Sequence, residues 1–88
     1  MANKSKTEKI QLRKDYTAGV AKANRGVDSL VRIFGGRASQ VAEMAHDAAD
    51  KRMYHAIASG AAHQAQYNRG QAMGYGMYAH TGKKLPPK

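Results

Sequence analysis

Four histidines and a short acidic run are the residues of this chain that invite a metal or catalytic site. The histidines are His46, His55, His63 and His80. They are nine, eight and seventeen residues apart, so none forms the pair four residues apart with which one helix face binds zinc. Glu43 and His46 form one Glu-x-x-His step, but a di-iron bundle needs two such steps and two further glutamates, and the chain's other glutamate is Glu8. We therefore expect no metal site and no cofactor.

Nucleophilic catalysis finds no better support in the sequence. The chain has no cysteine, and none of its serines lies in the G-x-S-x-G pattern that exposes a nucleophile on a tight turn. Acids and bases lie close together only in residues 43–51, and a helical chain of 88 residues has little room for a water-excluding cleft. We expect the protein not to be an enzyme.

The strongest chemical signal is positive charge at both ends of the chain. The formal net charge is +9 and the isoelectric point is about 10.1. Residues 1–14 carry a net charge of +4, residues 15–50 carry −1, and residues 51–88 hold six bases and no acid. Such a balance favours a polyanionic partner, either nucleic acid or an acidic protein surface.

The bases give a set of candidate phosphate contacts: Lys4, Lys6, Lys9, Arg13, Lys14, Arg69, Lys83 and Lys84. Three tyrosines, Tyr67, Tyr75 and Tyr78, are interleaved with glycines beside the last of these lysines. Aromatic rings among bases are typical of sequence-independent binding to single strands, but they also serve as anchors on acidic protein surfaces. No zinc finger, RNP-type strand motif or basic zipper is present, so we expect any nucleic-acid contact to be nonspecific.

A long helix over residues 6–34 is expected to position the first basic cluster. Ser5 and Glu8 match a capping box, and two apolar series with a spacing of seven follow it. The series are Val20, Val27 and Phe34, and Tyr16, Ala23 and Leu30. Gly19 and Gly26 precede the two valines, which favours either two glycines tolerated in an amphipathic helix or close approach of another helix or subunit. We predict that Val20, Val27, Leu30 and Phe34 bind a partner, together with the three tyrosines.

Gly35 and Gly36 predict a turn, after which ten alanines predict a second helix over residues 37–66, with a possible bend at Gly60. From residue 67 onward, Gly, Tyr and Met replace that pattern. The fold is therefore expected to be all-α: a helical hairpin domain over residues 1–66 and an extended or partly helical basic tail over residues 67–88.

Large apolar side chains are scarce, since Leu, Ile, Val and Phe together number eleven, or 12.5% of the chain. Eight of them lie between residues 10 and 34. A core this thin is expected to leave the isolated chain only partly helical and to require a partner for full order. No secretory signal and no membrane span is recognisable.

These features predict a non-enzymatic structural or assembly protein that becomes ordered in a larger, nucleic-acid-associated complex. The composition, rich in Ala, Gly, Gln, Met and Tyr and without Cys or Trp, resembles that of small accessory virion proteins of tailed phages. That resemblance implies a minor virion component, located in the cytoplasm or inside a viral particle. Two alternatives stay open: a regulatory protein that inhibits or recruits a nucleic-acid enzyme, and a free DNA- or RNA-binding protein. The expected partner is another protein or a second copy of the chain. We expect no association with a membrane.

Overall fold

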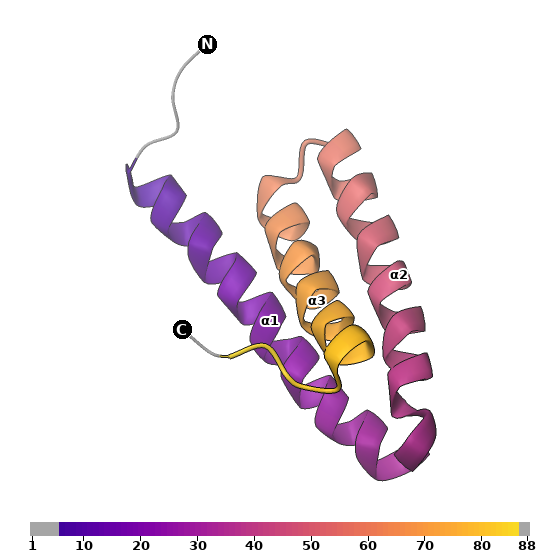
Figure 1. The fold of residues 1–88 in the computed structure, drawn as a ribbon. Helices are drawn as coiled ribbons and strands as arrows, with labels where there is room; N and C mark the ends of the chain where they lie inside the picture. The colour runs from indigo at the N-terminus through magenta and orange to yellow at the C-terminus, as the bar shows by residue number, and fades with distance from the viewer. Residues whose placement is uncertain (1–5, 87–88) are drawn as a thin grey trace.

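The computed structural model describes residues 6–86, and these residues form an all-α fold (Figure 1). Helix α1 spans Lys6–Phe34, a short 3-10 turn spans Gly35–Arg37, α2 spans Ala38–Ala58 and α3 spans Ala62–Thr81. No strand occurs within this part of the chain, so the predicted fold class is confirmed. Within the same residues, no helix is long and apolar enough to cross a membrane.

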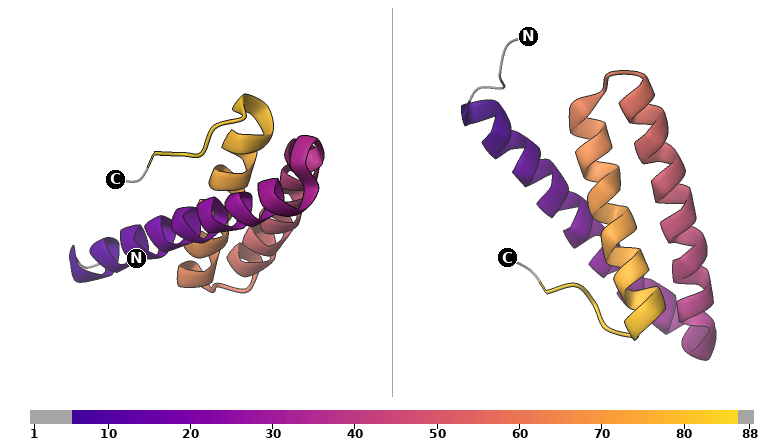
Figure 2. Two further views of the ribbon diagram at one scale, coloured as in Figure 1. Left: turned by 90° about the horizontal axis from the view of Figure 1, so that it is seen from below. Right: turned by 45° about the horizontal axis from the view of Figure 1, so that its top comes forward.

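The last helix occupies the centre of the molecule. Helix α3 packs against both α1 and α2, whereas α1 and α2 meet mainly near the turn that joins them (Figures 1 and 2). Helix α2 runs antiparallel to α3, while α1 crosses α3 obliquely and its N-terminal half extends beyond the other two helices. An α-helix of 29 residues is about 43 Å long, and α1 accordingly sets the longest dimension of 48 Å. The outer half of α1 is therefore open on most of its sides.

The first helix begins and ends where the sequence predicts. Gly35 adopts a left-handed conformation with φ of 55°, which terminates α1 directly after Phe34. The predicted capping residue Ser5 lies outside the described residues.

The predicted C-terminal end of the second helix is wrong. Helix α2 stops at Ala58 instead of continuing to residue 66, and a new helix begins at Ala62. Gly60 has φ of 75°, its amide donates to the Ile57 carbonyl at 3.1 Å, and the amide of Ala61 donates to the Ala56 carbonyl at 2.9 Å. This pair of bonds is the Schellman arrangement that closes a helix at a left-handed glycine. Gly60 therefore reverses the chain where a bend was expected.

Most of the segment expected as a tail is helical. Residues 67–81 belong to α3, and the chain leaves the helix only at Gly82, where φ is 73°. Gly70, Gly74 and Gly76 are all buried inside this helix. Each interior glycine costs a helix roughly 1 kcal/mol relative to alanine, so α3 depends on its packing against two neighbours.

Those glycines allow main chains to approach closely. A side-chain carbon added to Gly19 would overlap the main-chain carbonyl of Tyr67, and one added to Gly70 would overlap that of Tyr16. Of the two alternatives for Gly19, the structure supports close approach of another helix, and that helix is α3 of the same chain. Gly26 instead faces the side chain of Tyr75.

The core between the helices is built mostly from alanine. Seven of its ten apolar members are alanines, and Val27 is the largest fully buried side chain. Small side chains bury little area for each residue that is ordered. The thin core expected from the composition is therefore present, with its members spread over all three helices.

Candidate nucleic-acid interface

A groove of about 980 Å³ runs along the outer half of α1. Its walls come from α1, from the start of α3 and from the extended end of the chain. The lining residues are Lys9, Leu12, Arg13, Tyr16, Thr17, Val20, Ala21, Asn24, Gln66, Leu85 and Pro86. Leu12 and Val20 are buried and give the groove an apolar floor, whereas Lys9 and Arg13 are exposed. The groove thus combines an apolar interior with positive charge at its N-terminal end.

The extended end of the chain forms one wall because two polar contacts hold it against α1. The Asn24 side-chain amide (Nδ2) donates a hydrogen bond to the Leu85 carbonyl at 2.9 Å, across 61 residues of sequence. Lys84 Nζ lies 2.9 Å from Asp28 Oδ1, and both side chains are largely exposed. An exposed ion pair contributes little by itself, so the Asn24 bond is the more specific of the two. These contacts place the basic C-terminal end beside the helix that carries the basic N-terminal cluster.

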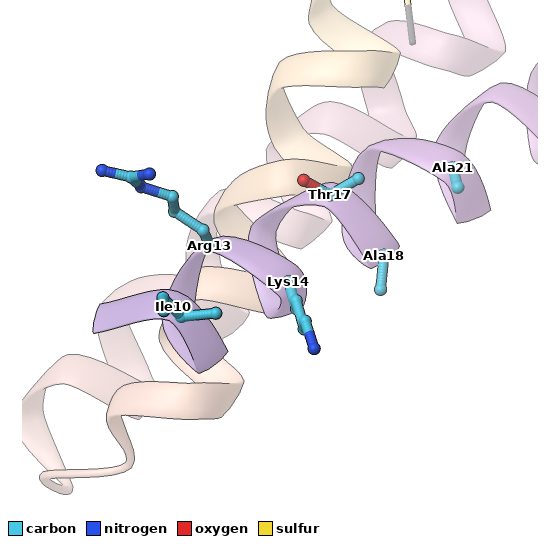
Figure 3. Close-up of a pocket in the computed structure, with 6 residues that line it drawn as sticks. All are labelled: Ile10, Arg13, Lys14, Thr17, Ala18 and Ala21. Carbon is cyan, nitrogen blue, oxygen red and sulfur yellow. The ribbon is translucent and has the colours of Figure 1, made fainter. Parts of the chain in front are cut away.

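A second pocket, of about 430 Å³, adjoins the groove on α1 (Figure 3). It is lined by Ile10, Arg13, Lys14, Thr17, Ala18 and Ala21. Figure 3 shows the side chains of Arg13 and Lys14 extending away from the helix in different directions. Ile10 remains 46% exposed there although it is apolar. Arg13, Thr17 and Ala21 line both pockets, so the two pockets adjoin along α1.

The structure brings together only some of the predicted phosphate contacts. Lys9 and Arg13 line the groove, Lys14 lies at the second pocket, and Lys6 is exposed at the start of α1. Lys83 and Lys84 are exposed on the extended end that folds back on α1. Arg69 is exposed on α3, and Lys4 lies outside the described residues.

The predicted partner-binding residues differ in how exposed they are. Val20 and Val27 are 6% and 1% exposed, because the chain's own core covers them. Leu30 is half-buried and Phe34 is 43% exposed. The three tyrosines that were expected in a tail are half-buried on α3, namely Tyr67, Tyr75 and Tyr78. The Tyr75 ring faces Gly26, so this tyrosine contributes to packing between α1 and α3.

Acids and histidines of the described residues make contacts between and within helices. His63 Nδ1 lies 2.5 Å from Asp15 Oδ2 and joins α3 to α1. His46 Nδ1 lies 2.7 Å from the Ala72 carbonyl, which can only accept, so this nitrogen carries the proton and donates. The other ring nitrogen of His46 faces Asp50 at 3.4 Å. Within residues 6–86, no group of three His, Asp or Glu side chains is placed to hold a metal ion.

Two groove residues carry chemistry that the sequence analysis did not assign to binding. Tyr16 was placed in an apolar series, and its ring is half-buried in the groove wall. Asn24 was not singled out, yet it holds the extended end, and its Oδ1 is buried without a hydrogen-bond partner within residues 6–86. Tyr16 lies three and seven residues after Arg13 and Lys9, a spacing that places all three on one helix side. This spacing is the sequence feature from which Tyr16 could have been grouped with the two basic residues.

No family model, no curated protein and no solved structure matches this chain.

Proposed function

We propose that this protein is a non-enzymatic, nucleic-acid-associated subunit that takes part in the assembly of a larger complex. In this proposal the outer half of α1 and the extended basic end contact phosphates without reading base sequence. The net charge of +9 favours such a partner, since phosphate neutralisation releases counterions and drives association.

The observation that carries the proposal is the convergence of the two basic ends on one helix. Lys9 and Arg13 belong to the first cluster, and Lys84 belongs to the second. The Asn24–Leu85 hydrogen bond and the Asp28–Lys84 ion pair bring residues 82–86 back to α1, so both clusters border the same helix. The acids Glu43, Asp47 and Asp50 belong to α2, on the other side of α3 from α1 (Figure 1). Helix α1 itself carries seven bases and three acids, and one of those acids, Asp28, pairs with Lys84. The helix and the extended end together therefore keep a positive balance of charge.

Exposed apolar side chains support the assembly part of the proposal. Five of the eleven large apolar residues are exposed: Ile10, Val31, Ile33, Phe34 and Ile57. Three of these lie together at the C-terminal end of α1, where Ile33 is 70% exposed. A chain with so few large apolar residues gains little by leaving them in water. A protein partner that covers this end of α1 would bury them.

The test is the salt dependence of binding to a duplex and to a single strand of the same length. Changing Lys9→Gln and Arg13→Gln together should weaken binding and reduce the slope of log K against log salt. Two lost phosphate contacts correspond to a decrease of about 1.8 on duplex DNA and about 1.4 on a single strand. Fluorescence anisotropy with a labelled oligonucleotide measures both quantities.

The matched control removes two charges from elsewhere on the surface. Arg37 lies in the turn after α1 and Lys51 lies on α2, and both are exposed. The Arg37→Gln, Lys51→Gln variant has the same net charge as the test variant, and its slope should remain close to that of the original chain. Equal slopes for the two variants would show that net charge alone drives binding. Absence of binding to either nucleic acid at about 0.1 M salt would refute the proposal.

A further inference from the structure

We propose that the groove along α1 holds unpaired bases of a single-stranded nucleic acid, with the Tyr16 ring as the stacking surface and Lys9 and Arg13 on the phosphates. This inference rests on the proposed function and adds to it the preferred substrate, a single strand. From the sequence, the tyrosines now found in α3 were candidates either for base stacking or for anchoring on a protein partner, whereas Tyr16 lies in α1.

The groove has the size and lining that a planar heterocycle requires. Its volume of about 980 Å³ lies at the upper end of the range of roughly 300–1,000 Å³ found for small-molecule sites. Leu12 and Val20 are buried apolar residues of the lining, and the half-buried Tyr16 lines the same groove as the exposed Arg13. A base stacked on an aromatic ring, with its phosphate near a cation, is the arrangement used in sequence-tolerant binding of single strands.

The positive charge of the groove lining favours a ligand that carries negative charge. All charged side chains in the groove lining are basic, namely Lys9 and Arg13. An uncharged apolar ligand would leave both of them without a counter-charge, whereas a nucleotide matches the apolar interior with its base and the cations with its phosphate. A duplex keeps the faces of its bases stacked inside and cannot offer them to the Tyr16 ring. The groove should therefore bind single strands more tightly than duplexes.

Asn24 supplies a hydrogen-bond acceptor for the base edge. Its Nδ2 is committed to the Leu85 carbonyl, and its Oδ1 is buried without a partner among the described residues. A buried acceptor without a donor costs free energy, and the amino or imino N–H of a base is such a donor. Because the oxygen is not exposed in the structure, a base reaches it only if the surrounding groove shifts locally.

The experiment compares a groove tyrosine with a matched tyrosine elsewhere. Tyr54 lies on α2 and is 65% exposed, so Tyr54→Leu is the control for Tyr16→Leu. The probes are labelled oligodeoxynucleotides and oligoribonucleotides of one sequence, single-stranded and as duplexes. Tyr16→Leu should weaken single-strand binding by roughly 5- to 150-fold and leave duplex binding and the salt slope unchanged. Tyr54→Leu should change neither. Comparison of the DNA probes with the RNA probes shows which of the two single-stranded nucleic acids binds more tightly.

A cross-linking measurement on the unchanged chain keeps the inference testable if Tyr16→Leu does not fold. A single strand with 5-iodouracil is irradiated in the complex, and trypsin then releases residues 15–22 with Tyr16 and residues 53–69 with Tyr54 and Tyr67. Cross-links on residues 15–22 support the groove. Cross-links confined to residues 53–69 would overturn it.

The possible results separate this inference from the function on which it rests. Equal affinity for single strands and duplexes, with no effect of Tyr16→Leu, overturns base recognition and leaves phosphate binding intact. Polyglutamate that competes as well as the single strand identifies an acidic peptide as the occupant and also overturns it. If neither nucleic acid binds at about 0.1 M salt, the proposed function fails as well.

Discussion

The contact between α1 and α3 gives the sharpest test of the fold, through the substitution Gly70→Ala. A side-chain carbon at this position would overlap the Tyr16 carbonyl and lie 2.9 Å from the Val20 amide nitrogen and 3.1 Å from the Gly19 α-carbon. All three obstacles are main-chain atoms of α1. None can move aside as a flexible side chain would, so the two helices must separate to admit one methyl group.

Two opposing terms set the expected magnitude. Alanine in place of glycine favours a helix by about 1 kcal/mol. Overpacking a close contact costs typically about 1–3 kcal/mol, and the upper part of that range applies because the obstacles are main chain. The net effect should be a destabilisation of about 1–2 kcal/mol. In a domain of this size that corresponds to a decrease in Tm of roughly 4–16 °C.

The assay is urea and thermal unfolding followed by far-ultraviolet circular dichroism. Because we expect full order only in a complex, each titration is run on the chain alone and on the chain saturated with a single-stranded oligonucleotide. Gly36→Ala is the control, since a side-chain carbon there meets no atom within 4 Å and Gly36 does not have a positive φ. It should be neutral or stabilising by up to about 1 kcal/mol. A Gly70→Ala chain as stable as the control would refute the close packing of α1 on α3.

Two further substitutions test the core and the extended end. Val27→Asp places a charge at a site that is 1% exposed, so it should abolish most helical signal in circular dichroism and prevent nucleic-acid binding. Near-original helicity would show that Val27 is not in the core. Asn24→Ala removes the hydrogen bond to Leu85, so trypsin should cleave after Lys84 several-fold faster while cleavage after Lys51 is unchanged. Equal rates after Lys84 would mean that Asn24 does not hold this segment.

The first helix was predictable because its signals are local. The apolar spacing through Val20 and Val27 and the glycine pair after Phe34 specify α1 and its end without reference to the rest of the chain. Gly19 also gave a correct signal for close packing, although the sequence did not say which helix approaches it.

The third helix was not predictable in the same way. Its apolar residues have almost no helical periodicity, because α3 is covered by α1 on one side and by α2 on the other. Gly74 faces Ala23 of α1, and Gly76 faces His46 of α2. A glycine that breaks an isolated helix is here required for packing. Local propensity therefore indicated a tail where tertiary contacts produce the central helix.

The candidate site was predictable in its charge and not in its shape. Lys9 and Arg13 were predicted as candidate phosphate contacts from the basic cluster alone. The groove beside them exists because Leu85 returns to α1 and bonds Asn24 across 61 residues. No local pattern specifies a pairing at that distance along the chain, so Tyr16 and Asn24 became candidates only in the folded structure.

The core and the charge together explain why order should depend on nucleic acid. Alanine and glycine let three helices pack closely, but they bury little apolar area, and a net charge of +9 adds self-repulsion to the compact state. In the proposed complex, a polyanion along α1 would act on both terms, because it would neutralise the bases and bind only the folded groove. Ligand at 100 times its dissociation constant stabilises the folded state by about 2.7 kcal/mol, a large share of the stability that so small a core provides. Binding and folding are then one equilibrium, and a substitution that weakens the groove should also lower helicity in the complex.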